Sequence, residues 1–130
     1  MRRVRLFLVV GIAAGLACGK GEEPVGPVAG DLTVAYGTQS ATDGAVLILV
    51  TGGAVTSVTA VGQYRVASAS VGVNATRVVV TGDLSAGDLF RIRVPDVSLV
   101  GSYIARIESA ADRTTFALGD PGLYSAAIRR

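Results

Sequence analysis

The chain has 130 residues, half of them apolar, with one cysteine, no histidine, no tryptophan and a net charge of +2. This length suits a single domain with one modest core. The missing histidine removes the commonest general base and the commonest metal ligand. A single cysteine excludes an internal disulfide and a thiolate zinc site.

The first 17 residues have the layout of a secretory signal peptide. Arg2, Arg3 and Arg5 precede an uncharged apolar run that extends from Leu6 to Cys18. A basic head, about 12 apolar residues and small residues at the end are typical of such a segment. The run is shorter than the roughly 20 residues that a membrane-spanning helix needs. Two alternatives stay open: a buried N-terminal helix or strand, and ordinary signal cleavage that leaves a soluble periplasmic protein.

The end of this run resembles the lipobox of bacterial lipoproteins, through Ala14, Gly15, Leu16, Ala17 and Cys18. The family favours leucine three places before the cysteine, where this chain has glycine. The resemblance implies that Cys18 carries a diacylglycerol thioether and usually an amide-linked fatty acid such as palmitate. These chains would anchor the protein to membrane lipid in the bacterial cell envelope. Glycine rather than aspartate after the cysteine favours the outer membrane, if the host has one.

Residues 18–30 predict a tether, because they are rich in glycine and proline and have little to bury. Removal of residues 1–17 takes away three of the 12 cations and none of the ten anions, leaving nine against ten. The mature chain therefore has a charge of −1, and the basic composition gives no reason to expect a nucleic-acid partner.

From residue 31 onward, short apolar or alternating runs predict strands, in chain order, at 31–36, 45–50, 55–61, 63–66, 77–81, 89–94, 103–108, 114–118 and 123–128. Residues 45–50 are apolar on both faces, which indicates a central strand. In 89–94, alternation predicts that Phe90, Ile92 and Val94 face inward and Leu89, Arg91 and Arg93 outward. Clusters of glycine, aspartate and proline separate the runs. No window sustains a helical period.

Seven to nine short strands with turns every 8–12 residues predict that residues 31–130 form one antiparallel β-sandwich, with a small β-barrel as the alternative. Three segments carry a weak resemblance to cohesin-like and immunoglobulin-like bacterial sandwiches: 57–59, 78–82 and 86–94. The resemblance consists of a glycine-containing turn before an apolar strand. It implies the fold and says very little about function.

The inventory of catalytic side chains is thin, which indicates a protein that is not an enzyme and has no cofactor. Six aspartates fall in predicted turns, where this residue bonds the local backbone: Asp43, Asp83, Asp88, Asp96, Asp112 and Asp120. Asp83 and Asp88 bracket one loop and are weak candidates for a calcium site at a sandwich end. No other metal site is expected.

Tyrosines are the other candidate binding residues. Tyr36 and Tyr103 fall on the inward parity of their strands, so packing is their expected role, while Tyr64 and Tyr124 could also stack on sugar rings. Arg91, Arg93 and Arg106 are expected on wet outer faces.

Three functions follow from these features, in order of preference. The first is a non-catalytic interaction or structural module that is lipid-anchored in the envelope and binds another envelope protein through a sheet edge or loop end. The second is a carbohydrate or small-ligand binding module, and the third is a small carboxylate-dependent hydrolase.

Overall fold

The structure is a computed structural model that describes residues 26–130. The predicted signal peptide, the lipobox residues Ala14 to Ala17 and the proposed lipidation site Cys18 lie outside the described residues. Within residues 26–130, no helix has the length and apolar character needed to cross a bilayer.

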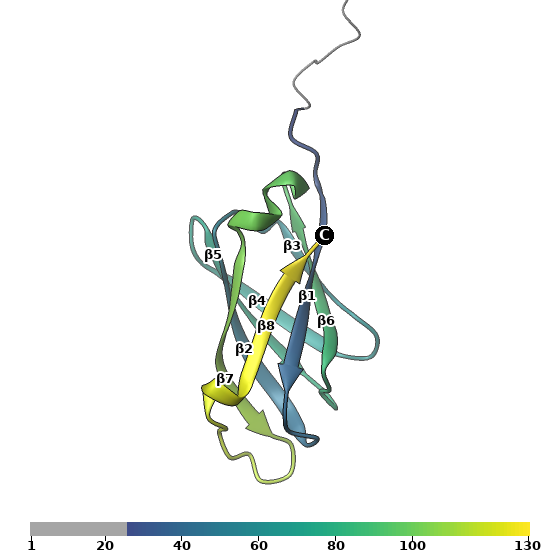
Figure 1. Ribbon diagram of the computed structural model, residues 1–130, viewed down its shortest axis with the longest axis vertical. Coiled ribbons are helices and arrows are strands. Elements are labelled where there is room, and N and C mark those ends of the chain that lie inside the picture. The colour runs from purple at the N-terminus through teal and green to yellow at the C-terminus, as the bar shows by residue number, and fades with distance from the viewer. Residues whose placement is uncertain (1–25) are drawn as a thin grey trace, which may run out of the picture.

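Two four-stranded antiparallel sheets form the domain (Figure 1). One sheet has the order β3 (Ser57–Ala60), β6 (Gly87–Val94), β1 (Gly30–Thr38), β8 (Tyr124–Arg129). The other has the order β4 (Arg65–Gly72), β5 (Ala75–Thr81), β2 (Asp43–Thr51), β7 (Ile104–Asp112). The sheets do not close into a barrel, so the predicted β-sandwich is confirmed and the alternative of a small barrel is wrong. The apolar run at 45–50 is part of β2, which is an interior strand as expected.

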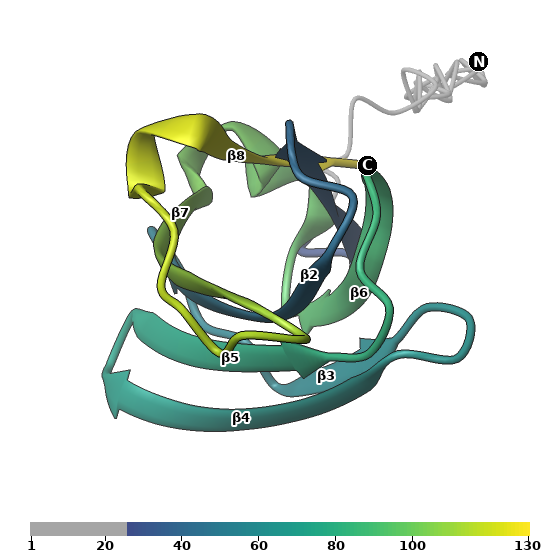
Figure 2. The same ribbon diagram turned by 90° about the horizontal axis from the view of Figure 1, so that it is seen from below.

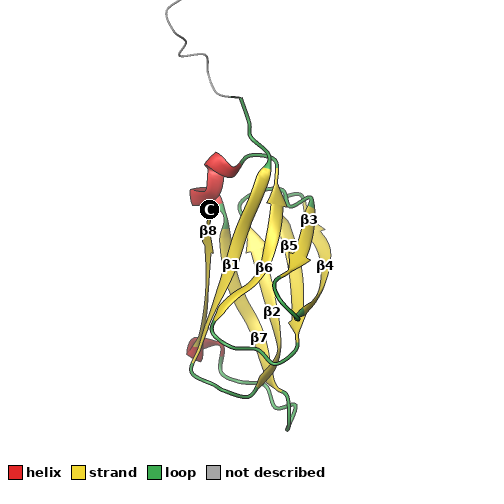
Figure 3. Cartoon of the chain, turned by 90° about the vertical axis from the view of Figure 1, so that its right-hand side faces the viewer, coloured by secondary structure: helices red, strands yellow, loops and turns green. Residues whose placement is uncertain are grey.

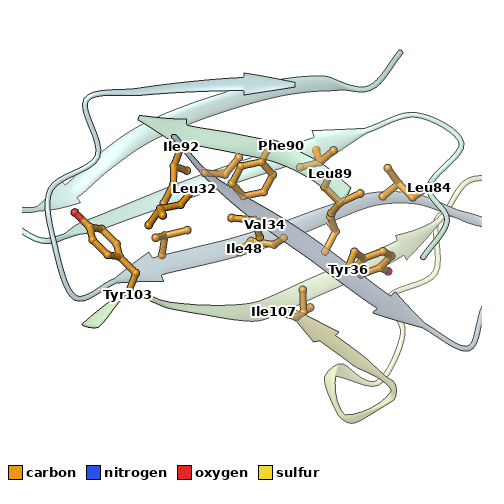
Figure 4. Close-up of a cluster of buried hydrophobic side chains, with 14 of the residues drawn as sticks. Leu32, Val34, Tyr36, Ile48, Leu84, Leu89, Phe90, Ile92, Tyr103 and Ile107 are labelled. Atoms are coloured by element: carbon orange, nitrogen blue, oxygen red, sulfur yellow. The ribbon is translucent and has the colours of Figure 1, made fainter. Parts of the chain in front are cut away.

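The core lies between the inner faces of the two sheets (Figure 4). In β1 the alternation predicted from the sequence holds, because Leu32, Val34 and Tyr36 are buried and the residues between them are more exposed. Phe90 and Ile92 of β6 lie beside them in the same sheet, and the other sheet contributes Ile48, Val78, Val80 and Ile107 to the core. These aliphatic and aromatic side chains are the main source of stability, at roughly 25 cal/mol for each Å² of apolar surface removed from water.

A β-bulge in β6 changes one predicted side-chain direction. Phe90 pairs with Val34 and Asp88 pairs with Ala35, so Leu89 has no partner of its own on β1. An extra residue of this kind lets two successive side chains face the same side of a sheet. Leu89 is therefore fully buried beside Phe90, whereas simple alternation predicted that it would face outward.

Other boundaries also differ from the sequence prediction. Residues 114–118 are not a strand but part of the loop between β7 and β8, where Leu118 makes one isolated bridge to Ala111. β4 continues to Gly72, well beyond the predicted end at residue 66, and β1 begins at Gly30, one residue before the predicted domain boundary. Two short 3₁₀ helices were not predicted, η1 (Val97–Ser102) and η2 (Pro121–Leu123), and they lie at opposite ends of the sandwich (Figure 3).

The sandwich has two distinct ends. At the tether end, the chain enters β1 at Gly30, which is paired with the last residue of β6, Val94. The C-terminus lies at the same end (Figure 1). At the distal end lie the loops after β1, β3, β5 and β7 (Figure 2).

Candidate functional site

Within the part of the chain that the structure describes, the distal end has two hollows, and the first lies between the β3–β4 loop and the β5–β6 loop. It has a volume of about 590 Å³ and is lined by Val61, Gly62, Gln63, Tyr64, Gly82, Asp83 and Asp88. The two aspartates singled out in the sequence therefore face the same hollow. Tyr64 contributes the only aromatic ring of this described lining, and its hydroxyl lies 3.4 Å from the Ser85 hydroxyl.

Each of these aspartates is engaged by an arginine from a different element. The Asp83 carboxylate lies 3.6 Å from the Arg113 guanidinium, and the Asp88 carboxylate lies 2.6 Å from that of Arg129. Among residues 26–130, no group of three or more acidic, histidine or cysteine side chains is placed to hold a metal ion. Calcium takes about six to eight oxygen ligands, and these two carboxylates supply only part of such a set.

The same two carboxylates are the nearest approach to a hydrolase site in the described residues. A carboxylate-dependent hydrolase needs one carboxyl group that donates a proton, typically against an apolar wall, and a second that acts as base or nucleophile. Here the side chain of Asp83 is 89% exposed and both carboxylates face guanidinium groups. The arrangement is that of surface ion pairs around a hollow.

A second hollow lies on the other side of the Gly82–Asp83 turn. It has a volume of about 410 Å³ and is lined by Gly44, Ala45, Thr81, Gly82, Asp83, Ala111, Asp112, Arg113 and Phe116. The β7–β8 loop forms one wall and presents three large apolar side chains to solvent: Phe116, which is 80% exposed, Leu118 and Leu123. Phe116 itself lines the hollow, and an exposed aromatic ring at the edge of a hollow is typical of a binding surface.

Phe116 has a left-handed backbone with φ of 58°, the one positive φ at a non-glycine residue in the described chain. For a residue with a side chain this conformation costs about 1–2 kcal/mol. Strained residues of this kind concentrate at functional sites, where neighbouring interactions hold them. The Phe116 N–H donates to the Asp112 carbonyl at 3.0 Å, which is one such interaction.

Asp112 organises the base of this loop. Its carboxylate accepts hydrogen bonds from the Thr42 hydroxyl and from the backbone N–H groups of Thr114 and Thr115, the latter two at 2.8 and 3.0 Å. These donors, first the Thr42 hydroxyl, hold the pKa of Asp112 well below its usual value. The Arg113 N–H also donates to the Thr42 carbonyl at 2.8 Å, so the loop is tied to the neighbouring β1–β2 loop.

Asp112, Asp96 and Asp120 act as predicted from their turn positions. Asp96 and Asp120 precede η1 and η2, and each accepts a hydrogen bond from a backbone N–H two residues later. The Ser98 hydroxyl, with the Ser98 N–H, lowers the pKa of Asp96.

Asp43 differs from the other aspartates that were predicted to lie in turns. It was predicted to be a turn residue, but it is the first residue of β2 and is 1% exposed. Its carboxylate accepts hydrogen bonds from the hydroxyls of Tyr36, Thr38 and Tyr124, at 2.8, 2.6 and 3.4 Å. The Tyr36 and Tyr124 rings are stacked with centroids 6.0 Å apart. Asp43 thus joins β1, β2 and β8 beneath the distal loops.

Tyr103 packs inward as predicted: it is buried, and its hydroxyl donates to the Ala54 carbonyl at 2.7 Å. Arg91, Arg93 and Arg106 lie on exposed faces as expected. Sequence reasoning missed Phe116 and Leu118 as surface residues, because their alternating spacing indicates a strand. The signal that identifies a loop is the Asp-Arg-Thr-Thr sequence before them, since aspartate and threonine bond the local backbone.

Comparison with known proteins gives no relative from which to infer function: no family model matches the sequence, and neither a curated protein nor a solved structure shows significant similarity to it.

Proposed function

We propose that this chain is a lipid-anchored protein of the bacterial cell envelope whose β-sandwich binds a partner protein through its distal end. The lipobox-like sequence around Cys18 supports the anchor. The observation that carries the binding role is the β7–β8 loop, whose exposed Phe116 ring lines a hollow of about 410 Å³ and which also exposes Leu118 and Leu123.

The position of this loop fits an anchored binding module. Residues 26–30 enter the sandwich at the end opposite the β7–β8 loop (Figure 1). A lipid at Cys18 would therefore leave the distal end free to meet a partner. Aromatic and aliphatic side chains in the centre of an interface supply most of its binding energy, and the polar groups around the hollow supply specificity.

The anchor is tested in cells by labelling with a radioactive fatty acid. We expect the wild-type chain to take up label and Cys18→Ala to take up none. Equal label on both chains would reject the lipoprotein assignment.

The binding surface is tested by chemical cross-linking in intact cells, with a matched pair of variants. Phe116→Ser removes the most exposed ring of the loop, and we expect it to abolish the cross-linked complex. Val79→Ser alters an exposed valine in the middle of β5, away from the loop, and we expect it to keep the complex. Loss of the complex in both variants, or in neither, would reject the distal loop as the binding surface.

A second candidate, a carbohydrate-binding module, is supported by the hollow of about 590 Å³ that combines the Tyr64 ring with Gln63, Asp83 and Asp88. A ring for stacking beside amide and carboxylate acceptors suits sugar hydroxyls. If cell-wall polysaccharide on an affinity gel retains the wild type but not Tyr64→Ala, this candidate replaces the first.

A further inference from the structure

The tether end of the sandwich carries a second group of exposed aliphatic side chains. Val73 is 93% exposed and Ile104 is 63% exposed, and Val28, Val71 and Leu99 are also exposed. These five residues, here named the tether-end apolar set, come from four segments: the chain before β1, the β4–β5 hairpin, η1 and the start of β7.

Pairing within the fold brings these segments to the same end. Thr51, the last residue of β2, pairs with Ala75 on one side and with Ile104 on the other. The Gly52 N–H donates to the Asn74 carbonyl at 3.2 Å at the hairpin tip. The Val97 N–H donates to the Val28 carbonyl at 2.9 Å, which ties the incoming chain to η1.

The length of chain that precedes this end identifies what can cover it. Val28 is ten positions after Cys18, and ten extended residues span at most about 36 Å. A lipid on Cys18 would therefore keep the tether end close to the bilayer surface. The short connection raises the effective concentration of that surface, so weak apolar contacts are enough to hold the domain against it.

The chemistry of this end also suits the boundary between lipid headgroups and acyl chains. All five side chains are aliphatic, and burial of such groups in that boundary is favourable. Two of the carboxylates near this end are engaged within the protein: Asp31 lies 3.6 Å from Arg93, and Asp96 accepts from Ser98. The charged groups that stay exposed near the apolar set are the cations Arg106 and Arg130, which suit anionic headgroups.

We propose that the tether-end apolar set docks on the membrane surface, with Val73, Leu99 and Ile104 inserted at the headgroup–acyl boundary. This inference rests on the proposed lipid anchor at Cys18. It fixes the orientation of the molecule, because it turns the distal end, with Phe116 and Leu118, away from the bilayer.

The absence of tryptophan from the sequence allows a direct test with a single reporter. Mature lipidated protein carrying Val73→Trp is reconstituted into vesicles of phosphatidylethanolamine and phosphatidylglycerol whose acyl chains are brominated. We expect blue-shifted emission and loss of most of the fluorescence, because bromine quenches a nearby indole. Leu118→Trp, at the exposed distal loop, is the matched control and keeps its fluorescence.

A second reporter and a flotation assay make the outcome decisive. Leu99→Trp places the indole on η1 and is expected to behave as Val73→Trp does. Protein that floats with the vesicles while both tether-end reporters stay unquenched overturns the membrane contact and leaves the anchor intact. Quenching of Leu118→Trp alone, or equal quenching of all three, also overturns it. A Cys18 that takes up no fatty acid overturns the anchor and the docking together.

Discussion

At the scale of single residues, the most consequential group is the buried carboxylate of Asp43. A buried charge is costly unless it is hydrogen-bonded, and here three hydroxyls supply the bonds. Two of them belong to tyrosines that also pack in or against the core, Tyr36 and Tyr124. The sequence places Asp43 beside Gly44 and so indicates a turn. Only the tertiary pairing of β1 with β8 shows that two tyrosines converge on it.

Asp43→Asn is predicted to destabilise the domain by about 2 kcal/mol, since hydrogen bonds to a charged group contribute about 1.5–3 kcal/mol and the amide replaces one acceptor by a donor. The measurement is the free energy of unfolding in urea. Asp83→Asn is the matched control, and because its ion pair is largely exposed we expect a change within about 0.5 kcal/mol. Equal losses in the two variants would contradict a special role for the Asp43 cluster.

At the scale of elements, strand prediction succeeds where side-chain polarity alternates and fails where it does not. β1 and β2 are recognisable because buried apolar residues contrast with their neighbours or form a continuous run. The second half of β4 was not predicted, because its residues 67–72 are exposed on both faces and, apart from Val71, small. Residues 114–118 show the opposite error: they alternate like a strand, but the hydrogen bonds to Asp112 close them into a loop. The bulge at Leu89 depends on pairing with β1 and has no local sequence signal.

The loop between β2 and β3 gives a prediction at this scale, because it passes directly over the junction of η1 and β7. Gly52 has φ of 99°, and a Cβ atom there would overlap the Ser102 carbonyl group. We expect Gly52→Ala to lower the free energy of unfolding by about 3 kcal/mol or more, since backbone strain and overpacking add.

Gly62→Ala is the control for Gly52→Ala. Gly62 also has a positive φ, 60°, but a Cβ there has no neighbour within 4 Å. Only the backbone cost of about 1 kcal/mol is expected. If thermal unfolding shows the same loss for both variants, the close approach of the β2–β3 loop to η1 is not what requires Gly52.

At the scale of the whole molecule, the sandwich separates two apolar surfaces by the length of its strands. β1 has nine residues, about 30 Å at 3.3 Å per residue. Composition and turn spacing predict the sandwich, but neither predicts which loops share an end. That grouping follows from strand order and register. It gives Asp83 and Asp88 a common hollow and places Phe116 opposite the incoming chain.

The free energy of unfolding at high pH depends on tyrosines whose pKa values are raised by the fold. Burial, and then the hydrogen bond to Asp43, raise the pKa of Tyr36, and burial is also the main cause of the raised pKa values of Tyr103 and Tyr124. In the unfolded chain a tyrosine releases its proton near pH 10. Above that pH the folded state binds more protons than the unfolded state, so the free energy of unfolding falls as pH rises. Their contribution is complete below about pH 10 and is lost progressively above it.

We therefore expect urea unfolding of the mature chain to be nearly independent of pH from neutrality to about pH 9.5 and to weaken steeply above it. Each tyrosine that stays protonated only in the folded state contributes a slope of up to about 1.4 kcal/mol per pH unit. Tyr36→Phe lowers stability at neutral pH but removes one such group, so its free energy of unfolding should fall less steeply between pH 10 and 11. The comparison is of slopes rather than absolute stabilities, with tyrosinate absorbance recorded in parallel. A Tyr36→Phe slope as steep as that of the wild type would show that the Tyr36 hydroxyl ionises equally easily in both states, against the burial and the Asp43 hydrogen bond that the structure gives it.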